Sequence, residues 1–142
     1  MSQLIRDMTE ITRCGAQYRA DKLAPLGLKG CHASYLTEIC ACPGISQDRL
    51  SKRICINKSN IARQVAILEE EGFVIRQPSP ADKRVMELYP TEKALATLPE
   101  INEVLCTWSD HLTQELSDEE RESLSRVLEK MRDLASAWME GD

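Results

Sequence analysis

The segment between residues 45 and 90 contains the feature that most constrains the fold: two short helices, a tight turn between them, and then two strands. A first helix is predicted in ISQDRLSKRI, where Ser46 suits the N-cap and the helix dipole favours Asp48 in the first turn. A second helix is predicted to follow Asn57 and to end at Gly72. Its apolar residues recur at helical spacing, at Ile61, Val65 and Leu68. Such a pair is typical of a helix-turn-helix.

The apolar runs FVIRQ and RVMELY follow this helix pair and are predicted to form two strands. The loop RQPSPADKR, from Arg76 to Arg84, joins them and holds two prolines, one aspartate and three basic residues. A tight hairpin would carry Asn-Gly or Gly-Gly instead. A stiff cationic loop suits the narrow minor groove of DNA, and its prolines lower the entropy lost on docking. The alternative is a solvated hairpin tip that contacts nothing, and the upstream helix pair favours the first interpretation.

Further helices are predicted before this segment, over residues 2–24 and 31–40, with PLGLKG as the break between them. The first carries an apolar stripe at Leu4, Met8, Ile11 and Tyr18. The second has an apolar side at Cys31, Tyr35, Leu36 and Ile39. After the strands, Thr91 is predicted to cap another helix, in which Pro99 indicates a kink or a break.

A last helix is predicted after SDEE, where Ser117 and Glu120 have the spacing of a capping box. Its apolar stripe comes close to a heptad pattern, at Leu124, Val127, Leu128, Met131, Leu134, Ala135 and Trp138. A small domain offers little core for long terminal helices to cover. We therefore expect a homodimer built by these helices, with packing inside one chain as the alternative.

The 142 residues favour a single domain, and no apolar run approaches a membrane span. The first residues, MSQLIRDMTEITRC, lack the apolar core of a secretory signal, so a cytoplasmic protein is expected. The net charge of −5 is unevenly distributed. Residues 46–90 carry eight Lys or Arg and six Asp or Glu, whereas residues 91–142 carry five and thirteen. This asymmetry fits a protein that meets a polyanion with one part only, although a mild imbalance also arises by chance.

Taken together, these segments resemble the multiple-antibiotic-resistance regulator (MarR) family of winged-helix transcription factors, most clearly from Gly27 to Lys93. The similar stretches are GLKGCHASYL, GISQDRLSKRICINKSNIARQVAILEEEGFVIR, DKR at the loop tip, and PTEK. The chain departs from the family where His32 stands for the common Gln, Pro90 for Leu, and Ala94 for Gly.

The resemblance implies a mainly α fold with a small β wing, that is, a winged helix-turn-helix with N- and C-terminal dimerisation helices. Residues 1–142 would form one domain. Within it, residues 1–24 and 91–142 would dimerise and residues 28–90 would form the DNA-binding lobe. The implied function is a ligand-responsive repressor that binds double-stranded DNA as a homodimer on a pseudo-palindromic operator.

The expected DNA contacts come from the second helix of the pair and from the loop, the wing of such a fold. The helix residues that lie off its apolar stripe are free for DNA, and Arg63 and Gln64 suit guanine and adenine edges. In the family, an arginine at the place of Arg84 enters the minor groove, and an aspartate at the place of Asp82 supports the wing. The full predicted set is Lys58, Ser59, Asn60, Arg63, Gln64, Arg76, Lys83 and Arg84.

Regulation is expected to use a small aromatic or anionic effector, because relatives bind such acids between the dimer helices and the DNA-binding lobe. The candidate pocket residues are Arg13, Tyr18, His32 and Tyr35. A redox sensor of the same fold is the alternative. Cys14 is its candidate thiol, since the nearby Arg13 and Arg19 favour a thiolate. A winged-helix module that binds proteins is a further alternative, although a polar recognition face favours DNA.

Enzymatic activity is not expected, because GxSxG, P-loop, HExxH and GxGxxG motifs are absent from the sequence. A metal site is not expected either. Cys31-His32 and Cys40-x-Cys42 lack zinc-finger spacing, and Cys40 and Cys42 would point to different faces of one helix. No cofactor is predicted.

Overall fold

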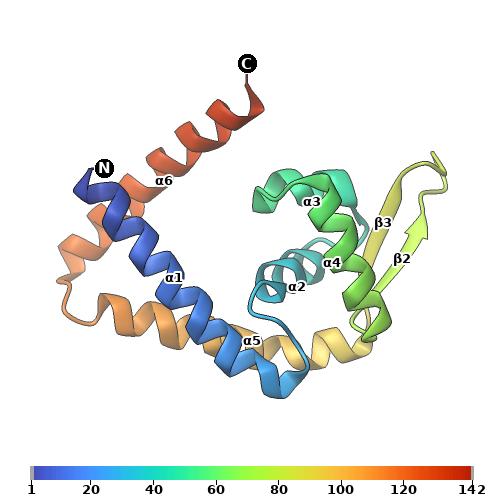
Figure 1. The fold of residues 1–142 in the computed structure, drawn as a ribbon, viewed down its shortest axis with the longest axis horizontal. Coiled ribbons are helices and arrows are strands. Elements are labelled where there is room, and N and C mark those ends of the chain that lie inside the picture. The colour runs from blue at the N-terminus through green and yellow to red at the C-terminus, as the bar shows by residue number, and fades with distance from the viewer. Residues whose placement is uncertain (1, 142) are drawn as a thin grey trace. The chain divides into compact units, whose positions relative to one another are not determined.

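The computed structural model describes residues 2–141 and is mainly helical, with one small sheet (Figure 1). The helices are α1 (Gln3–Leu23), η1 (Ala24–Leu26, a 3-10 turn), α2 (His32–Ala41), α3 (Gln47–Ile54), α4 (Lys58–Glu70), α5 (Glu92–Thr113) and α6 (Asp118–Glu140). The strands are β1 (Ile45–Ser46), β2 (Val74–Pro78) and β3 (Met86–Pro90). The chain divides into two compact units, one ending at Cys106 and one beginning at Thr107. Within residues 2–141, no helix is both long enough and apolar enough to span a membrane.

The predicted helix-turn-helix is confirmed by α3, α4 and their caps. The Ser46 hydroxyl accepts a hydrogen bond from the Arg49 backbone N–H at 3.1 Å, and the Asn57 side chain accepts one from the Asn60 N–H at 2.8 Å. These bonds satisfy backbone donors that the first turn of a helix leaves unpaired. Between the helices, Cys55 adopts the left-handed conformation, with φ at 55°. Gly72 ends α4 with φ at 83°, a conformation that glycine adopts without a steric penalty.

The sheet has three antiparallel strands in the order β1-β3-β2. Both predicted strands are present, and β2 pairs with β3 so that Arg76 lies opposite Leu88. The short strand β1 pairs with the other edge of β3, where Ile45 also lies opposite Leu88. The sequence analysis missed β1, because two residues are too few to show the alternation that identifies a strand.

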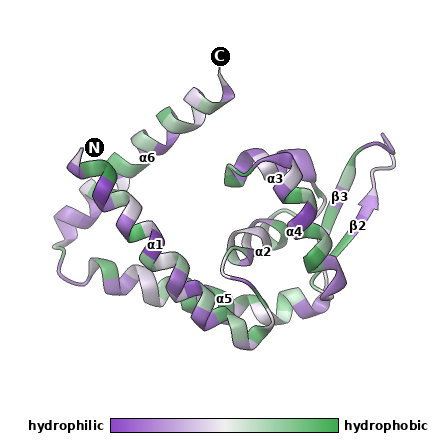
Figure 2. Ribbon diagram, viewed as in Figure 1, coloured by the Kyte–Doolittle hydropathy of each residue, from purple (hydrophilic) through white to green (hydrophobic). Residues whose placement is uncertain are grey.

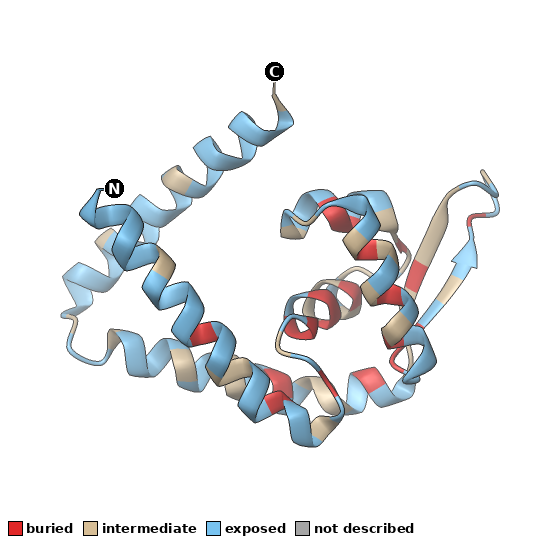
Figure 3. Ribbon diagram, in the orientation of Figure 1, coloured by how far each residue is buried: buried red, intermediate tan, exposed pale blue. Residues whose placement is uncertain are grey.

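The core lies between α2, α3, α4 and the sheet (Figure 3). Its fully buried side chains include Tyr35, Leu36, Ile39, Leu50, Ile61, Val65, Leu68, Phe73 and Leu88. The stripe predicted for α4 is therefore confirmed as its inward face. The apolar side predicted for α2 is confirmed except at Cys31, which is the exposed N-cap residue of that helix.

The loop before α2 approaches α1 very closely at Gly30. A Cβ atom added to this residue would lie 2.9 Å from the backbone nitrogen of Ala20 and 3.2 Å from the carbonyl oxygen of Ala16. Both contacts are with main-chain atoms, which cannot rotate aside as a side chain can. Only glycine therefore fits at this crossing.

The start of α5 is tied to the end of α4. Thr91 caps α5 by accepting the Ala94 N–H at 3.2 Å, as predicted, and its hydroxyl donates to the Gly72 carbonyl at 2.7 Å. The Lys93 ammonium donates to the Glu71 carbonyl at 2.8 Å and lies 4.3 Å from the centre of the Phe73 ring. The helix continues through Pro99, so the predicted alternative of a break there is wrong.

Helix α6 begins with the predicted capping box. The Glu120 N–H donates to the Ser117 hydroxyl at 3.1 Å, and the Ser117 N–H donates to the Glu120 carboxylate at 3.0 Å. The bond from the Ser117 backbone N–H, and then one from the Ser117 side chain, hold the pKa of the Glu120 carboxyl below its usual value. The apolar residues of α6 form the green patches of Figure 2, yet they remain largely exposed, with Leu134 at 73% and Trp138 at 85%.

Candidate nucleic-acid interface

The N-terminal turn of α4 presents polar side chains on the face away from its buried stripe. The Ser59 hydroxyl donates to Asn57 at 2.8 Å, and this bond fixes both groups at the positive end of the helix dipole. The Lys58 ammonium lies 3.6 Å from the Asp48 carboxylate. Both side chains are about two-thirds exposed or more, so water screens this ion pair and Lys58 can exchange it for a phosphate.

Arg63 is exposed and lies one turn further along α4. Its Nη2 donates to the Asn60 side-chain oxygen at 2.9 Å. Helical geometry places Arg63 roughly opposite the stripe of Ile61, Val65 and Leu68. The guanidinium is thereby aimed outward, and its remaining donors are free to pair with an anion or a base edge.

Gln64 occupies a different environment, although it is the next residue. It is half-buried at the border of the stripe, and its Oε1 lies 2.9 Å from Nε2 of His32 on α2. The Cys31 sulfur lies 4.0 Å from the same oxygen. The structure therefore engages the carbonyl side of this amide within the protein.

The wing residues Asp82 and Arg84 are joined by three hydrogen bonds. Oδ1 of Asp82 accepts from the backbone N–H of Arg84 at 3.0 Å and from its Nε at 3.1 Å, while Oδ2 accepts from Nη2 at 3.2 Å. Hydrogen bonds from the Arg84 side chain, and then from its backbone, lower the pKa of Asp82. The Arg84 side chain is nonetheless 91% exposed. Its guanidinium is held in place while one side remains open to a ligand.

The wing loop is closed by backbone bonds that the sequence did not reveal. The Ser79 N–H donates to the Val85 carbonyl at 2.7 Å, and the Val85 N–H donates to the Asp82 carbonyl at 2.9 Å. Ser79 is buried, and its hydroxyl accepts the Ala81 N–H at 3.3 Å. A serine next to proline is typical of such turns and was the available signal. Lys83 lies exposed in this ordered loop.

Arg76 has a different geometry from the other predicted DNA contacts. It is half-buried on β2, where its Nη2 lies 3.4 Å from the Glu69 carboxylate and its Nη1 lies 3.5 Å from the Gln47 amide oxygen. These bonds join the wing to α4 and α3. Arg76 is thus partly engaged inside the lobe, unlike Arg84.

The four predicted effector residues fall into two environments. Arg13 is exposed and Tyr18 half-buried, both on α1, whereas His32 and Tyr35 are buried on α2 with ring centroids 6.2 Å apart. Burial lowers the pKa of His32 and raises that of Tyr35. The Tyr35 hydroxyl is buried without a hydrogen-bond partner among the described residues. His32 and Tyr35 thus belong to the core rather than to an open surface.

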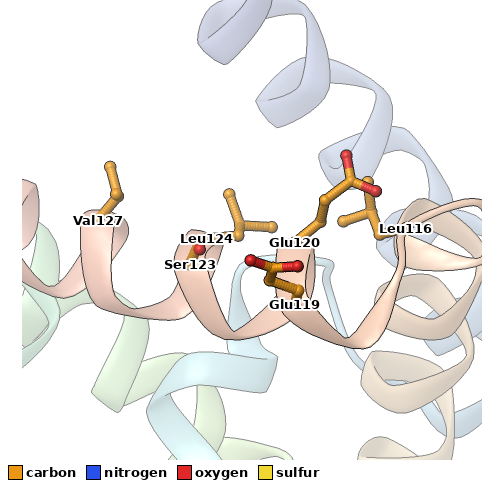
Figure 4. Close-up of a pocket in the computed structure, with 6 residues that line it drawn as sticks. All are labelled: Leu116, Glu119, Glu120, Ser123, Leu124 and Val127. Carbon is orange, nitrogen blue, oxygen red and sulfur yellow. The ribbon is translucent and has the colours of Figure 1, made fainter.

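An open cavity of about 470 Å³ lies along the first turns of α6. Figure 4 shows its lining, which consists of Leu116, Glu119, Glu120, Ser123, Leu124 and Val127. None of the predicted effector residues contributes to it. All six cysteines are free thiols, and Cys14 is exposed on α1. Within residues 2–141, no cluster of three or more His, Cys, Asp or Glu could hold a metal ion.

Comparison with known proteins agrees with this geometry. The model of the MarR family matches residues 32–86, the segment from the start of α2 into β3. The HTH-type transcriptional regulator YybA of Bacillus subtilis is 28% identical over 93% of this chain and 88% of its own length. The crystal structure of the transcriptional regulator SlyA is also 28% identical, with a TM-score of 0.93 over 98% of both chains.

A third relative gives the same fold at lower identity. It is a MarR family regulator from Listeria monocytogenes that was crystallised with a 26mer DNA. It is 24% identical to this chain, with a TM-score of 0.91 over 96% of this chain and 91% of its own. The capped helix pair, the wing and these comparisons show that the chain has a winged helix-turn-helix fold, with a MarR family match over residues 32–86 and structural neighbours that are MarR and SlyA transcriptional regulators.

Proposed function

We propose that this protein binds double-stranded DNA in a sequence-specific manner and regulates transcription as a homodimer on a pseudo-palindromic operator. The main support is the pair of Asp82 and Arg84 in the wing. Asp82 holds the Arg84 guanidinium by hydrogen bonds, although the Arg84 side chain is 91% exposed. A fixed cation on an ordered loop loses little entropy when it pairs with a phosphate or enters a narrow minor groove. The names of the relatives support a regulator rather than an enzyme.

The second element of the proposed interface is the N-terminal half of α4. Lys58 and Ser59 lie where helix dipole and backbone N–H groups favour phosphate, and Arg63 points away from the core. Backbone contacts would set the position on DNA, while Arg63 would contact base edges. The DNA complex of the Listeria monocytogenes relative, which has the same fold, supports this use of the lobe.

Dimerisation is proposed to use the terminal helices, residues 1–24 and 91–142, around a DNA-binding lobe of residues 28–90. The support is the exposure of apolar residues along α1 and α6, such as Ile11 at 49% and Leu128 at 49%. Two lobes related by a two-fold axis would contact half-sites about 10 base pairs apart, centre to centre. Because DNA binding releases counterions, the affinity should fall steeply as salt rises.

The proposed function is tested by replacing Arg84 with alanine. Duplexes bound by the wild type are first selected from genomic fragments, and affinity for the selected duplex is then measured by fluorescence anisotropy. Arg84→Ala should weaken binding by roughly 1–3 kcal/mol. Arg132→Ala, an exposed arginine on α6, is the matched control and should bind like the wild type. Undiminished affinity for DNA in Arg84→Ala would show that the wing is not part of the interface.

For regulation we propose repression that a small aromatic or anionic effector relieves, with oxidation of Cys14 as the rival. The exposed Cys14 thiol is the observation that supports the redox mechanism. The two mechanisms separate when all six cysteines are replaced by serine or alanine. Release of DNA by aromatic acids should survive the replacement. Release by peroxide that requires one cysteine, with no response to acids, would favour the redox sensor.

A further inference from the structure

The buried histidine of α2 has a defined tautomer. The backbone N–H of Lys29 donates to Nδ1 of His32 at 3.1 Å, so Nδ1 must be the unprotonated nitrogen. A neutral imidazole carries its proton on the other nitrogen, Nε2. Burial, which lowers the pKa of His32, keeps the ring neutral at physiological pH. The fixed backbone N–H of Lys29 thereby determines that Nε2 of His32 is a hydrogen-bond donor.

This tautomer fixes the orientation of the Gln64 amide. Nε2 of His32 lies 2.9 Å from Gln64, and a donor requires the amide oxygen rather than the amide nitrogen as its partner. The Cys31 thiol is a second, weak donor to the same oxygen at 4.0 Å. Both acceptor positions of the amide oxygen are therefore directed toward α2. The NH₂ group is the part of the half-buried Gln64 side chain that these two contacts leave unengaged.

We infer that His32 is a positioning residue for DNA specificity, which presents Gln64 to DNA as a hydrogen-bond donor only. The inference rests on the proposed function, because it assigns the specificity of the same interface. A donor selects acceptors on the base edge, and guanine offers two adjacent ones, N7 and O6, while thymine offers O4. Adenine is disfavoured because its single acceptor, N7, lies beside the N6 donor, which a donor-only group cannot satisfy. Bidentate pairing with adenine, which the sequence predicted, also needs the amide oxygen to accept from the base. The geometry thus revises the expected partner of Gln64.

Lys29, before α2, is the charged group that acts on His32, and Tyr35 lies against its ring. Cys31 and Arg63 act in turn on Tyr35. Lys29 also disfavours a protonated ring, as burial does. A protonated His32 would place a second N–H against the Lys29 N–H, and the bond that fixes the tautomer would be lost. Gln64 is therefore restricted to donating hydrogen bonds to DNA only while the His32 ring is neutral.

The test is a selection of bound duplexes from a randomised pool, with two substitutions at position 32. His32→Asn keeps an acceptor near the Lys29 N–H but has no group that reaches Gln64, so the amide can rotate. At one base pair in each half-site, the preference for guanine or thymine over adenine should fall by about three- to tenfold, the discrimination that one neutral hydrogen bond supplies. His111→Asn, a change of the exposed histidine on α5, should leave every position unchanged.

Gln64→Glu supplies the second measurement, because a carboxylate can still accept from His32 but has no donor for DNA. It should lose the same preference at the same base pair while its thermal unfolding stays close to that of the wild type. If His32→Asn proves unfolded by circular dichroism, Gln64→Glu alone decides the matter. A wild type that enriches no sequence would contradict the proposed function. A wild type that enriches a sequence whose preferences survive both substitutions would overturn this inference alone.

Discussion

Helices α4 and α6 carry nearly the same pattern of apolar residues but differ completely in burial. In α4, Ile61, Val65 and Leu68 have no exposed surface. In α6, Leu124 is 39% exposed, Leu128 is 49% exposed, and Trp138 near the C-terminal end is 85% exposed. Figure 3 shows the difference as red bands on α4 and a mostly pale blue α6. Periodicity therefore predicts which side of a helix will be covered, but not what covers it.

The difference between the helices separates two kinds of stabilisation. The stripe of α4 is covered by the chain itself and contributes to the stability of the lobe. The stripe of α6 leaves apolar surface in water, which costs free energy in an isolated chain and contributes to association when a second copy covers it. Four predictions test this division, in order of decreasing effect.

The largest effect is expected when a charge is placed in the α6 stripe. Leu128→Glu would bury an unpaired carboxylate at the proposed dimer interface, at a cost on the order of 3–5 kcal/mol in each protomer. Two-fold symmetry places the change in both copies. Sedimentation should show a shift from twice 16.0 kDa to 16.0 kDa. Glu129→Gln, at the neighbouring position, should stay dimeric, and a dimeric Leu128→Glu would show that the stripe lies outside the interface.

A truncation in the α4 stripe should instead destabilise the lobe. Leu68→Ala removes a fully buried side chain and leaves a cavity, at a cost of about 2–5 kcal/mol in the free energy of unfolding. The loss should be seen in urea unfolding. Leu134→Ala, which truncates a side chain that is 73% exposed in α6, is the matched change. At concentrations too low for dimers, Leu134→Ala should lower the free energy of unfolding far less than Leu68→Ala does. Equal losses would show that the two stripes do not differ in their contribution to the stability of a single chain.

A smaller effect is expected at the cap of α4. Asn57→Ala removes the acceptor for the Asn60 N–H and should lower the free energy of unfolding by about 1 kcal/mol. It also frees the Ser59 hydroxyl at the proposed phosphate site, so affinity for DNA should fall as well. Ser117→Ala, at the cap of α6, should lower stability without a direct loss of DNA contacts. Equal affinity losses in the two variants would show that the cap of α4 has no local role.

The smallest effect concerns pH and the buried His32. Because the pKa of His32 is lowered in the folded protein, the unfolded chain binds the proton more readily. The stability contributed by the neutral ring is present above the usual pKa of 6.5 and is lost as the pH falls through that value toward the folded pKa. Urea unfolding between about pH 7 and pH 5 should show this slope. His32→Gln should flatten it, and an unchanged slope would assign the effect to other groups.

Much of the fold could be predicted from the sequence, because local chemistry determines it. The caps at Ser46, Asn57, Thr91 and Ser117 each use a side chain that accepts from the backbone three residues further along. The strand β1 could not be predicted, because its pairing with β3 is a contact between distant segments. A kink or a break was predicted at Pro99, and the break was wrong, because α5 continues through this residue although proline removes one backbone N–H donor.

The candidate site shows the same limit. Exposure along α4 was predicted correctly for Lys58 and Arg63, because it follows from helical spacing. The environment of Gln64 was not, since it depends on His32, which lies 32 residues away in the sequence. Likewise, the partners of Arg76 on α4 and α3 are brought together only by the folded lobe. Local spacing predicts which residues are available, whereas tertiary contacts determine which of their atoms remain free.

The close approach at Gly30 limits the direction in which α1 can move relative to α2. Main-chain atoms of Ala16 and Ala20 already occupy the space beside Gly30, and close-packed main chain compresses very little. Motion of α1 toward this loop is therefore blocked by main-chain atoms. Any rearrangement that involves these two segments must begin by opening the gap between them.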